Sequence, residues 1–189
     1  MKKEKTNYPI ATDLSYDYKM EWSLQEDQKN WESLDKWLYL GADFKNRGFA
    51  KIGITMGDLS TRSYSSANPN YYIFCGFKCR YNISKKKLKC IERDILRKFT
   101  NFYIDENGDT KRLVHIDSGC FSECFDNVNF IHFLAHLHYE LFHNHNSSFI
   151  TGVFCDESGE EFGDILDIEF NKKFVTKSEQ SMYRLKLAQ

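Results

Sequence analysis

The stretch that decides the fold is WLYLGADFKNRGFAKIGIT, residues 37–55. Two runs of apolar and aromatic residues, within KWLYLGADF and FAKIGITMG, are separated by the polar, glycine-containing segment KNRG. This pattern is typical of two antiparallel strands joined by a short turn. We therefore expect a β-hairpin over these residues, and the neighbouring segments predict what surrounds it.

Three segments after the hairpin predict the rest of a small sheet and its helices. DLSTRSYSSA begins with Asp58, a good helix N-cap, and predicts a short helix before the Asn68-Pro69 break. YYIFCGFKCRY, residues 71–81, predicts a third strand. SKKKLKCIERDILRKFTNF, residues 84–102, predicts an amphipathic helix capped by Ser84, with its basic side chains outward. The predicted class is α+β, with a three-stranded mixed or antiparallel sheet flanked by helices.

Extensions are expected at both ends of this unit. Residues 1–36 are mostly polar and weakly periodic, with a short helix predicted over 24–34. After a strand near RLVHI, residues 127–145 predict a second long helix, and residues 148–170 predict two strands around an acidic, glycine-rich turn. The expected organisation is an N-terminal extension at 1–36, a core domain at 37–126, and a C-terminal helix and hairpin at 127–189.

Composition favours a protein of the cell interior. At 189 residues, 41% of them hydrophobic, the chain can bury a core, but no apolar stretch approaches the roughly 20 residues of a membrane span. The N-terminus has no apolar signal region. We expect a cytoplasmic protein of a bacterium or a phage-infected cell that does not bind membranes. Its six cysteines should then be reduced thiols, although the C-x3-C pairs Cys75/Cys79 and Cys120/Cys124 also leave a zinc site open.

Charge is distributed unevenly along a chain whose formal net charge is −1. Basic residues dominate residues 78–98, whereas residues 156–169 carry acidic residues and no basic one. A basic face of this kind can attract polyanions, although a solvated lysine-rich turn has the same composition. The residues expected to contact nucleic acid are Lys78, Arg80, Lys85, Lys86, Lys87, Lys89 and Arg93.

Four residues follow one another in an order that suits phosphodiester hydrolysis. This reaction needs an activator for water, cations that balance the charge growing on the phosphate, and help for the leaving oxygen. The predicted hairpin contains Tyr39 and Lys51, the next helix contains Arg62, and the amphipathic helix contains Glu92. Each has a simpler explanation, since Tyr39 could line the core, Lys51 and Arg62 could be solvated, and Glu92 could pair with a lysine of its helix.

With these residues in view, the hairpin resembles that of the GIY-YIG endonuclease superfamily. Residues 37–39 stand for the first tripeptide and residues 51–53 for the second, as in the phage-type and restriction-type subgroup that has lysine in place of the second tyrosine. KIGIT followed by Leu59-Ser60-Thr61-Arg62 is similar to that subgroup, as are IERDILRKF and the closing motif Glu123-Cys124-Phe125. The first tripeptide lacks its glycine, and the late asparagine of many relatives has three candidates, Asn101, Asn107 and Asn127.

The resemblance implies a role for each residue. Tyr39 would orient or activate water, with its pKa lowered by Lys51 and a metal. Lys51 and Arg62 would contact the phosphate, and Glu92 would hold one Mg2+ or Mn2+. Gly53 would let DNA approach the backbone closely. The implied function is a metal-dependent DNA endonuclease of phage-host conflict, restriction or mobile elements, with RNA not excluded and a homodimer as one option.

Two other functions stay open from the sequence. A domain that has lost catalysis would bind nucleic acid through its basic face, with an affinity that falls as salt rises. An inhibitor or adaptor would instead contact a host protein through the acidic segment 156–169. The histidines of the second long helix, including His132 and His136 at i, i+4 spacing, lack the H-E-x-x-H pattern and are better explained as helix residues packed on the sheet.

Overall fold

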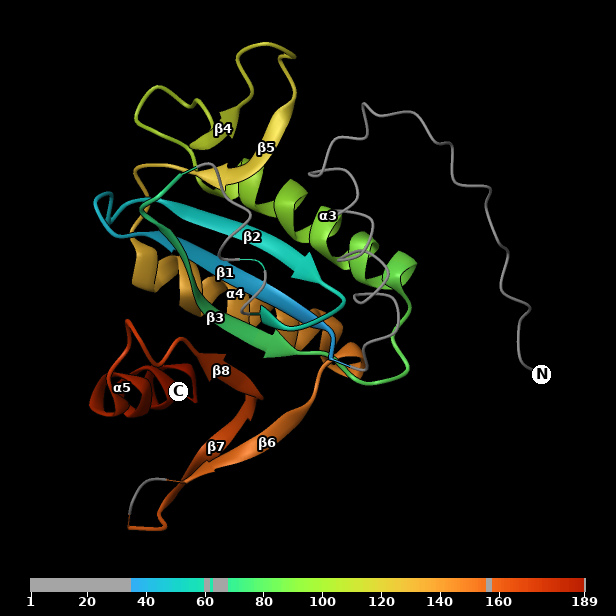
Figure 1. Ribbon diagram of the computed structural model, residues 1–189, viewed down its shortest axis with the longest axis vertical. Helices are drawn as coiled ribbons and strands as arrows, with labels where there is room; N and C mark the ends of the chain where they lie inside the picture. The colour runs from blue at the N-terminus through green and yellow to red at the C-terminus, as the bar shows by residue number, and fades with distance from the viewer. Residues whose placement is uncertain (1–34, 60–61, 63–67, 156–157, 189) are drawn as a thin grey trace, which may run out of the picture.

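The chain folds as an α+β protein built on one six-stranded sheet (Figure 1). The computed structural model describes residues 35–59, 62, 68–155 and 158–188. The extension expected at 1–36, with its helix at 24–34, therefore lies almost wholly outside the described residues. The sheet is antiparallel throughout, in the order β4 (Arg112–Val114), β5 (Phe121–Phe125), β2 (Ala50–Thr55), β1 (Trp37–Asp43), β3 (Tyr71–Lys78), β8 (Ile168–Phe170).

The three expected strands form the centre of this sheet. Tyr39 lies opposite Gly53 in the β1–β2 hairpin, and β1 pairs with β3 on its other side. The Asp43 carboxylate accepts hydrogen bonds from the backbone N–H groups of Lys45 and Asn46 at 2.7 and 2.9 Å, which fixes the turn between β1 and β2. The predicted hairpin is thus confirmed, and β4, β5 and β8 enlarge the expected three-stranded sheet to six strands.

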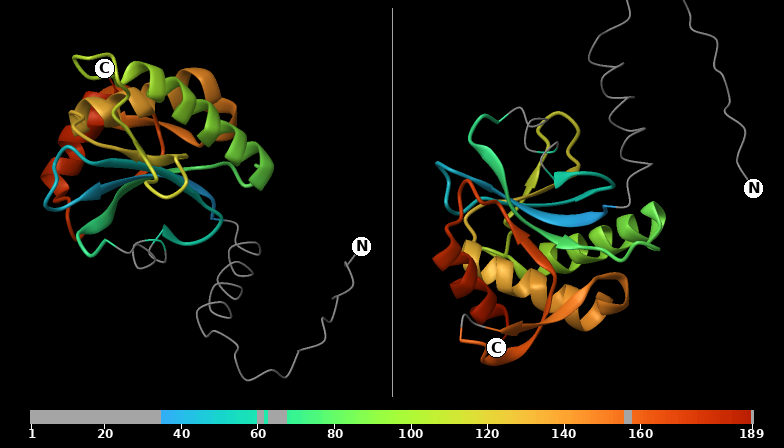
Figure 2. Two further views of the ribbon diagram at one scale, coloured as in Figure 1. Left: turned by 90° about the horizontal axis from the view of Figure 1, so that it is seen from above. Right: turned by 60° about the horizontal axis from the view of Figure 1, so that its bottom comes forward.

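Two long helices cover one face of the sheet (Figure 2). The first is α3 (Lys85–Phe102), in which the Ser84 hydroxyl accepts from the Lys87 N–H at 3.1 Å, as the sequence predicted. The second is α4 (Phe130–His145). Their apolar side chains meet those of alternate strand positions in one core, where the largest fully buried side chains include Phe77, Phe99, Phe125, Phe133, Leu38, Leu40, Ile52, Leu88 and Ile95.

The residues that follow α4, the C-terminal segment, pack against this core. After the 3-10 turn η1 (Asn146–Ser148), β6 (Thr151–Cys155) and β7 (Glu161–Leu166) form the expected hairpin as a separate two-stranded sheet. Burial lowers the pKa of His138 on α4 to about 4, and its neutral Nε2 accepts the Leu166 N–H at 3.1 Å. This bond ties β7 to α4.

Two elements of this segment went unpredicted. Strand β8 pairs with β3 in the main sheet, and α5 (Lys177–Leu187) starts at a capping box formed by Thr176 and Glu179. The Tyr183 ring of α5 lies 5.5 Å from that of Phe74 and 5.8 Å from that of Phe170. Among the described residues, no helix is both long and apolar enough to cross a membrane.

Alternation along the strands gives the second face of the sheet a different set of side chains. Leu38, Leu40 and Ile52 belong to the core under the helices. Since neighbouring residues of a strand point to opposite faces, Tyr39 and Lys51 lie on the other face. All of the strand residues of the predicted catalytic set therefore share one face.

Candidate active site

The ring of Tyr39 lies across β2 because Gly53 has no side chain. A Cβ built on Gly53 would lie 2.4 Å from the Tyr39 hydroxyl oxygen. Gly41 makes room for a second tyrosine in the same way, since its Cβ would lie 2.3 Å from the hydroxyl oxygen of Tyr71. Both rings are buried, with 6% and 8% of Tyr39 and Tyr71 exposed. The sequence assigned Gly53 to contact with DNA, whereas its missing side chain accommodates Tyr39.

Lys51 lies between an acidic residue and an aromatic ring. Its Nζ is 3.6 Å from Glu123 Oε2 on the neighbouring strand β5, and 5.5 Å from the centre of the Tyr71 ring. About a quarter of the Lys51 side chain is exposed (28%), as is half of that of Glu123. The ammonium group is thus fixed near Tyr71 and still reachable by an anion.

Arg62 reaches the same face from the segment that follows β2. Leu59 and Arg62 are helical, as expected, while the other residues of that predicted helix lie outside the described part of the chain. The Leu59 side chain packs where a Cβ on Gly76 would otherwise lie, which anchors the segment on β3. Arg62 Nε donates to Thr55 Oγ1 at 3.3 Å, next to the end of β2.

Glu92 completes the predicted set from α3, and its ionisation is disfavoured. Burial and, next, the negative charge of Glu123 raise the pKa of Glu92 to about 7, against the opposing influence of Lys89 and Lys51. Because the charged form of Glu92 is disfavoured, a cation that binds beside its carboxylate stabilises that form. Glu92 and Glu123 are therefore the acidic pair of the site.

The electrostatics of Tyr39 show that the set converges. The charged groups that act on its hydroxyl come from different elements and are, in order of influence, Lys51, Glu123, Arg62 and Glu92. Burial nevertheless outweighs Lys51 and raises the pKa of Tyr39 above its ordinary value. Lys51 acts in the expected direction, and the expected part of a metal in lowering this pKa stays a prediction. Tyr39 keeps its proton at neutral pH.

A pocket of about 290 Å3 opens beside Glu92 between α3 and the β4–β5 pair. Arginine side chains dominate its polar lining, which includes Arg93, Arg97 and Arg112. Arg112 is held in place because its Nε donates to the Ser122 carbonyl at 2.5 Å and its Nη1 to Thr100 Oγ1 at 3.0 Å. The cationic groups lie where an anion next to Glu92 would be bound.

Asn101 is the candidate asparagine that the structure brings to this pocket. Asn107 instead lies in the turn before β4, where its N–H donates to Asp105 Oδ1 at 2.9 Å. Asn127 has a positive φ of 54° in the turn after β5 and accepts from Lys111 through its carbonyl. Of the three candidates, Asn101 is the one that lines the pocket beside Glu92, and its role stays a prediction.

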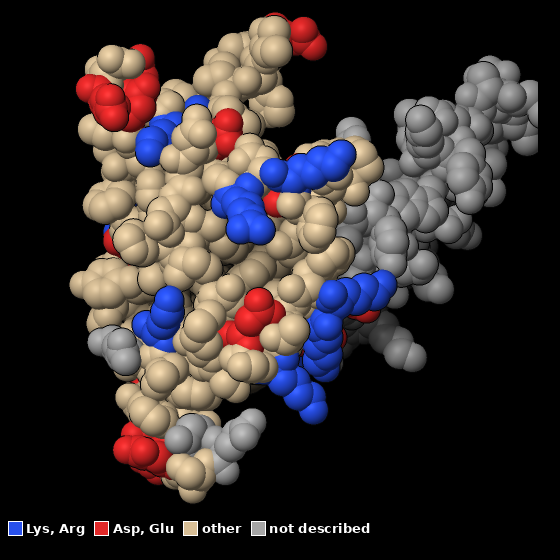
Figure 3. Space-filling model, turned by 90° about the vertical axis from the view of Figure 1, so that its left-hand side faces the viewer, with Lys and Arg blue, Asp and Glu red and all other residues tan. Residues whose placement is uncertain are grey.

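The predicted nucleic-acid contacts fall into three groups. Lys89 and Arg93 lie on α3 beside Glu92, whereas Lys85, Lys86 and Lys87 form the first turn of that helix. Lys78 is the last residue of β3 and its Nζ lies 3.8 Å from Asp35 Oδ1, whereas Arg80 follows β3 and its Nε donates to the Phe149 carbonyl at 3.0 Å. On the side of the molecule seen in Figure 3, basic and acidic groups alternate with uncharged surface rather than forming one basic patch.

Two members of the site were missed by sequence reasoning or given no role there. Tyr71 was assigned only to a strand, and Glu123 only to a closing motif. The signal for Tyr71 was Gly41, which sits two residues after Tyr39 just as Gly53 sits two after Lys51. Only the strand pairings show that these glycines leave space for the two tyrosine rings. The sequence alone could therefore not reveal the role of Tyr71.

Glu92 fits a hard divalent cation that keeps most of its water ligands. Such an ion needs only one or two carboxylates from the protein, which Glu92 with Glu123 can supply. Nowhere in the described ranges do three or more His, Cys, Asp or Glu side chains form a group that could hold a metal ion. All six cysteines are free, and Cys75 and Cys79 are buried in the core as the strand pattern predicted.

The likeness to GIY-YIG enzymes rests on the residues quoted from the sequence. No protein-family model matches the chain, and neither a curated protein nor a solved structure matches it. A functional conclusion therefore depends on the arrangement of Tyr39, Lys51, Arg62, Glu92 and Glu123.

Proposed function

We propose that the protein is a metal-dependent endonuclease that hydrolyses phosphodiester bonds in DNA, with a GIY-YIG-type active site. The observation that carries the proposal is the convergence on Tyr39 of charged groups from β2, α3, β5 and the helical segment at Arg62. These groups come from distant parts of the sequence, and Lys51 also lies 3.6 Å from Glu123 and 5.5 Å from the centre of the Tyr71 ring. Their types are those that the reaction needs.

Lys51 and Arg62 bind the phosphate in this proposal. Lys51 Nζ offers a point charge for a non-bridging oxygen, and the Arg62 guanidinium offers a planar set of donors. Both stabilise the negative charge that grows on the phosphate in the transition state. Glu123 holds Lys51 in place through the 3.6 Å ion pair.

Tyr39 positions the attacking water through its hydroxyl oxygen. Because the pKa of Tyr39 is raised, the phenol is neutral and donates its hydrogen bond rather than acting as a preformed base. Glu92 would act on the same water through the cation that it holds, since a bound divalent cation acidifies its water ligands. Gly53 keeps the Tyr39 ring in place.

Glu92 is also the residue that would hold Mg2+ or Mn2+. A bound divalent cation supplies charge on the phosphate and acidifies its own water ligands. Glu92 must be ionised to hold the ion, so cation binding and activity should both rise as pH passes through about 7. The arginines of the pocket beside Glu92 lie where they can bind the next phosphate of the strand.

The test follows nicking and linearisation of supercoiled plasmid by wild type, Glu92→Gln and Glu106→Gln, with Mg2+, with Mn2+ and with EDTA. Glu92→Gln should lower the cleavage rate at least about 100-fold, because it removes the ionisable group. Glu106 is an exposed residue of the turn before β4, so Glu106→Gln should cut at the wild-type rate.

Substrate breadth separates the proposal from its alternatives. Wild-type protein that leaves plasmid, linear duplex, single-stranded DNA and RNA intact with both metals would refute the endonuclease. If it still bound DNA in a salt-sensitive way, the binding function inferred from the basic residues would replace it. Cleavage of RNA alone would change the proposed substrate from DNA to RNA and leave the proposed active site unchanged.

A further inference from the structure

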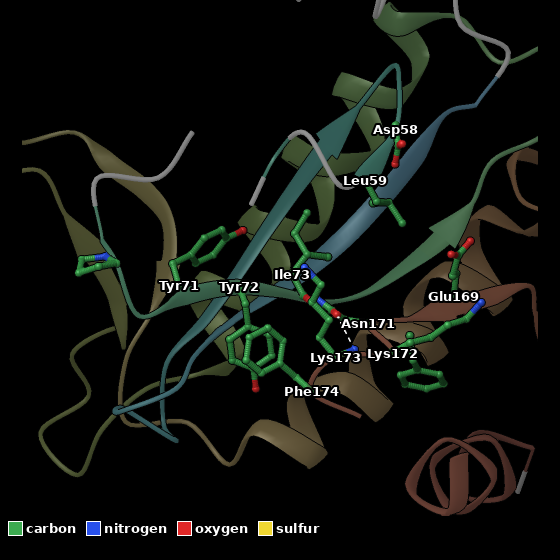
Figure 4. Close-up of a pocket in the computed structure, with 12 residues that line it drawn as sticks. Asp58, Leu59, Tyr71, Tyr72, Ile73, Glu169, Asn171, Lys172, Lys173 and Phe174 are labelled. Carbon is green, nitrogen blue, oxygen red and sulfur yellow. Dashed lines mark hydrogen bonds between the residues drawn. The ribbon is translucent and has the colours of Figure 1, made fainter. Parts of the chain in front are cut away.

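A second pocket, of about 530 Å3, lies where the C-terminal segment meets the sheet (Figure 4). Its walls come from β3, from the segment around Leu59, and from the residues that follow β8. The Tyr72 and Phe174 rings lie next to each other at one end, with centroids 4.2 Å apart and an angle of 31° between the planes. The Phe44 ring also lies near Phe174, with centroids 6.5 Å apart, but Phe174 is still 47% exposed, so part of the aromatic pair is accessible to another ring.

Polar groups surround this apolar interior. Lys172 and Lys173 are exposed and line the pocket beside the aromatic pair, and the acidic residues Asp58 and Glu169 also line it. The Asn171 side chain fixes that loop, since its Nδ2 donates to the Ile73 carbonyl at 2.9 Å and its Oδ1 accepts the Lys173 N–H at 3.1 Å. The two lysines are therefore presented by an anchored turn.

The pocket borders the candidate active site through Tyr71. This residue lines the pocket, while its ring lies over Gly41 and near Lys51. Its hydroxyl is buried and lies close to that of Tyr39, so the two tyrosines connect the wall of the pocket to the candidate active site.

We propose that this pocket binds an unpaired nucleobase of the substrate strand, next to the phosphate held at Lys51. The base stacks on the exposed side of the Tyr72 and Phe174 pair, and Lys172 and Lys173 contact the phosphates on either side of it. Every base has an aromatic face, so stacking of this kind selects unpaired nucleotides over duplex without selecting a sequence. The volume suits one nucleoside, since small-molecule pockets span about 300–1,000 Å3.

This inference rests on the proposed nuclease function and makes it more specific. A base can enter the pocket only when it is not stacked within a duplex, and unstacking costs least at a gap, a flap or a mismatch. The protein should therefore prefer DNA with an unpaired nucleotide beside the cut. Residues outside the predicted 37–126 domain supply this preference.

The test uses a short oligonucleotide with 2-aminopurine at one unpaired position, titrated with wild type, Phe174→Ala and Tyr139→Ala in EDTA. Without divalent metal no cleavage is needed for the readout, so the pocket and the nuclease can fail separately. Wild type should quench the fluorescence and bind the single strand more tightly than the matching duplex. Phe174→Ala should lose the quenching and bind about 5- to 100-fold more weakly.

The control is an aromatic residue of similar exposure that does not line the pocket. Tyr139 is 56% exposed on α4, so Tyr139→Ala should bind and quench like wild type. Lys172→Ala should retain the quenching and reduce the salt dependence of binding, because it removes one phosphate contact. Equal affinity of wild type and Phe174→Ala for the single strand, with both variants folded by circular dichroism, would overturn the proposal. Quenching in EDTA without cleavage in Mg2+ would keep the pocket and reject the nuclease.

Discussion

The two faces of the central sheet use the same strands for opposite purposes. Under α3 and α4, alternate residues such as Leu40 and Ile52 are completely buried among apolar side chains. On the other face, Tyr39 is almost as buried, yet its surroundings are Lys51 and other charged groups. Burial alone therefore does not distinguish a residue that stabilises the fold from one that belongs to a site.

The two faces differ in whether burial of their side chains gains or costs free energy. The helix-covered face gains free energy with each apolar group that it buries. The other face buries the hydroxyls of Tyr39 and Tyr71, and Glu92 of α3, which acts on Tyr39, has its pKa raised to about 7; both cost free energy in the folded state. Mutations should then range from a large loss of stability in the core, through a smaller loss at Gly53, to a small gain at Glu92.

The largest effect is expected from Phe99→Ala in the core. Phe99 is fully buried on α3 and contacts the rings of Phe133 and Phe125 at 5.0 and 6.3 Å. Removing the ring leaves a cavity, so the free energy of unfolding should fall by about 3–5 kcal/mol. Urea titration followed by circular dichroism measures the change. Phe102→Ala, on the same helix but 65% exposed, should cost less than about 1 kcal/mol, and equal costs would contradict the assigned core.

The next effect tests whether the glycines of the second face exist for the tyrosines. In Gly53→Ala, the new Cβ would lie 2.4 Å from the Tyr39 hydroxyl oxygen, so the ring must move, at a cost of about 1–3 kcal/mol. Thermal denaturation should detect this loss. Plasmid cleavage should fall with it.

Two comparisons make this second prediction specific. Gly152 on β6 has no atom within 4 Å of a built Cβ, so Gly152→Ala should change the stability by less than about 0.5 kcal/mol. In a Tyr39→Ala background, Gly53→Ala should lose most of its cost, because the clashing ring is gone. An undiminished cost there would show that Gly53 is needed for the backbone and not for Tyr39.

The sequence was most informative where the pattern is local. The hairpin at residues 37–55, the Ser84 cap and the helical spacing of α3 predicted their elements because each depends on residues a few positions apart. Strand β8 was missed because it has only three residues, and pairing with β3 decides its place. Helix α5 was missed although Thr176 and Glu179 form a capping box, since it has no fully buried residue to give it an apolar pattern.

The residues of the site could be predicted from the sequence, but the direction of their pKa shifts could not. Tyr39, Lys51, Arg62 and Glu92 could be chosen in order along the chain, and their closeness depends on the sheet register that the hairpin already indicated. The direction of the Tyr39 pKa could not be chosen, because it depends on how much burial opposes Lys51. Glu123 entered the site only through the pairing of β5 with β2.

The smallest expected effect is a gain of stability in Glu92→Gln, and its pH dependence is the sharpest contrast with the core. The folded-state pKa of Glu92 is about 7 against an ordinary value of 4.5, so between these values the folded state binds the proton more tightly than the unfolded state. Wild type should lose stability as pH rises from about 4.5 to 7 and lose no more above it. Glutamine mimics the protonated acid, so the variant should match wild type at pH 4.5 and exceed it by about 1–2 kcal/mol at pH 8, allowing for partial solvent screening.

Unfolding in urea at pH 4.5, 6, 7 and 8, for wild type, Glu92→Gln and Glu106→Gln, measures this difference. Glu106→Gln, at an exposed turn, should follow wild type at every pH. A gain in Glu92→Gln that does not vary with pH would mean that packing and not ionisation is changed, and the raised pKa would be rejected. Mg2+ should narrow the gap at pH 8, because an ion bound to the wild-type carboxylate stabilises only the folded state. If Mg2+ does not change this difference in the free energy of unfolding although plasmid is still cut, the metal binds away from Glu92.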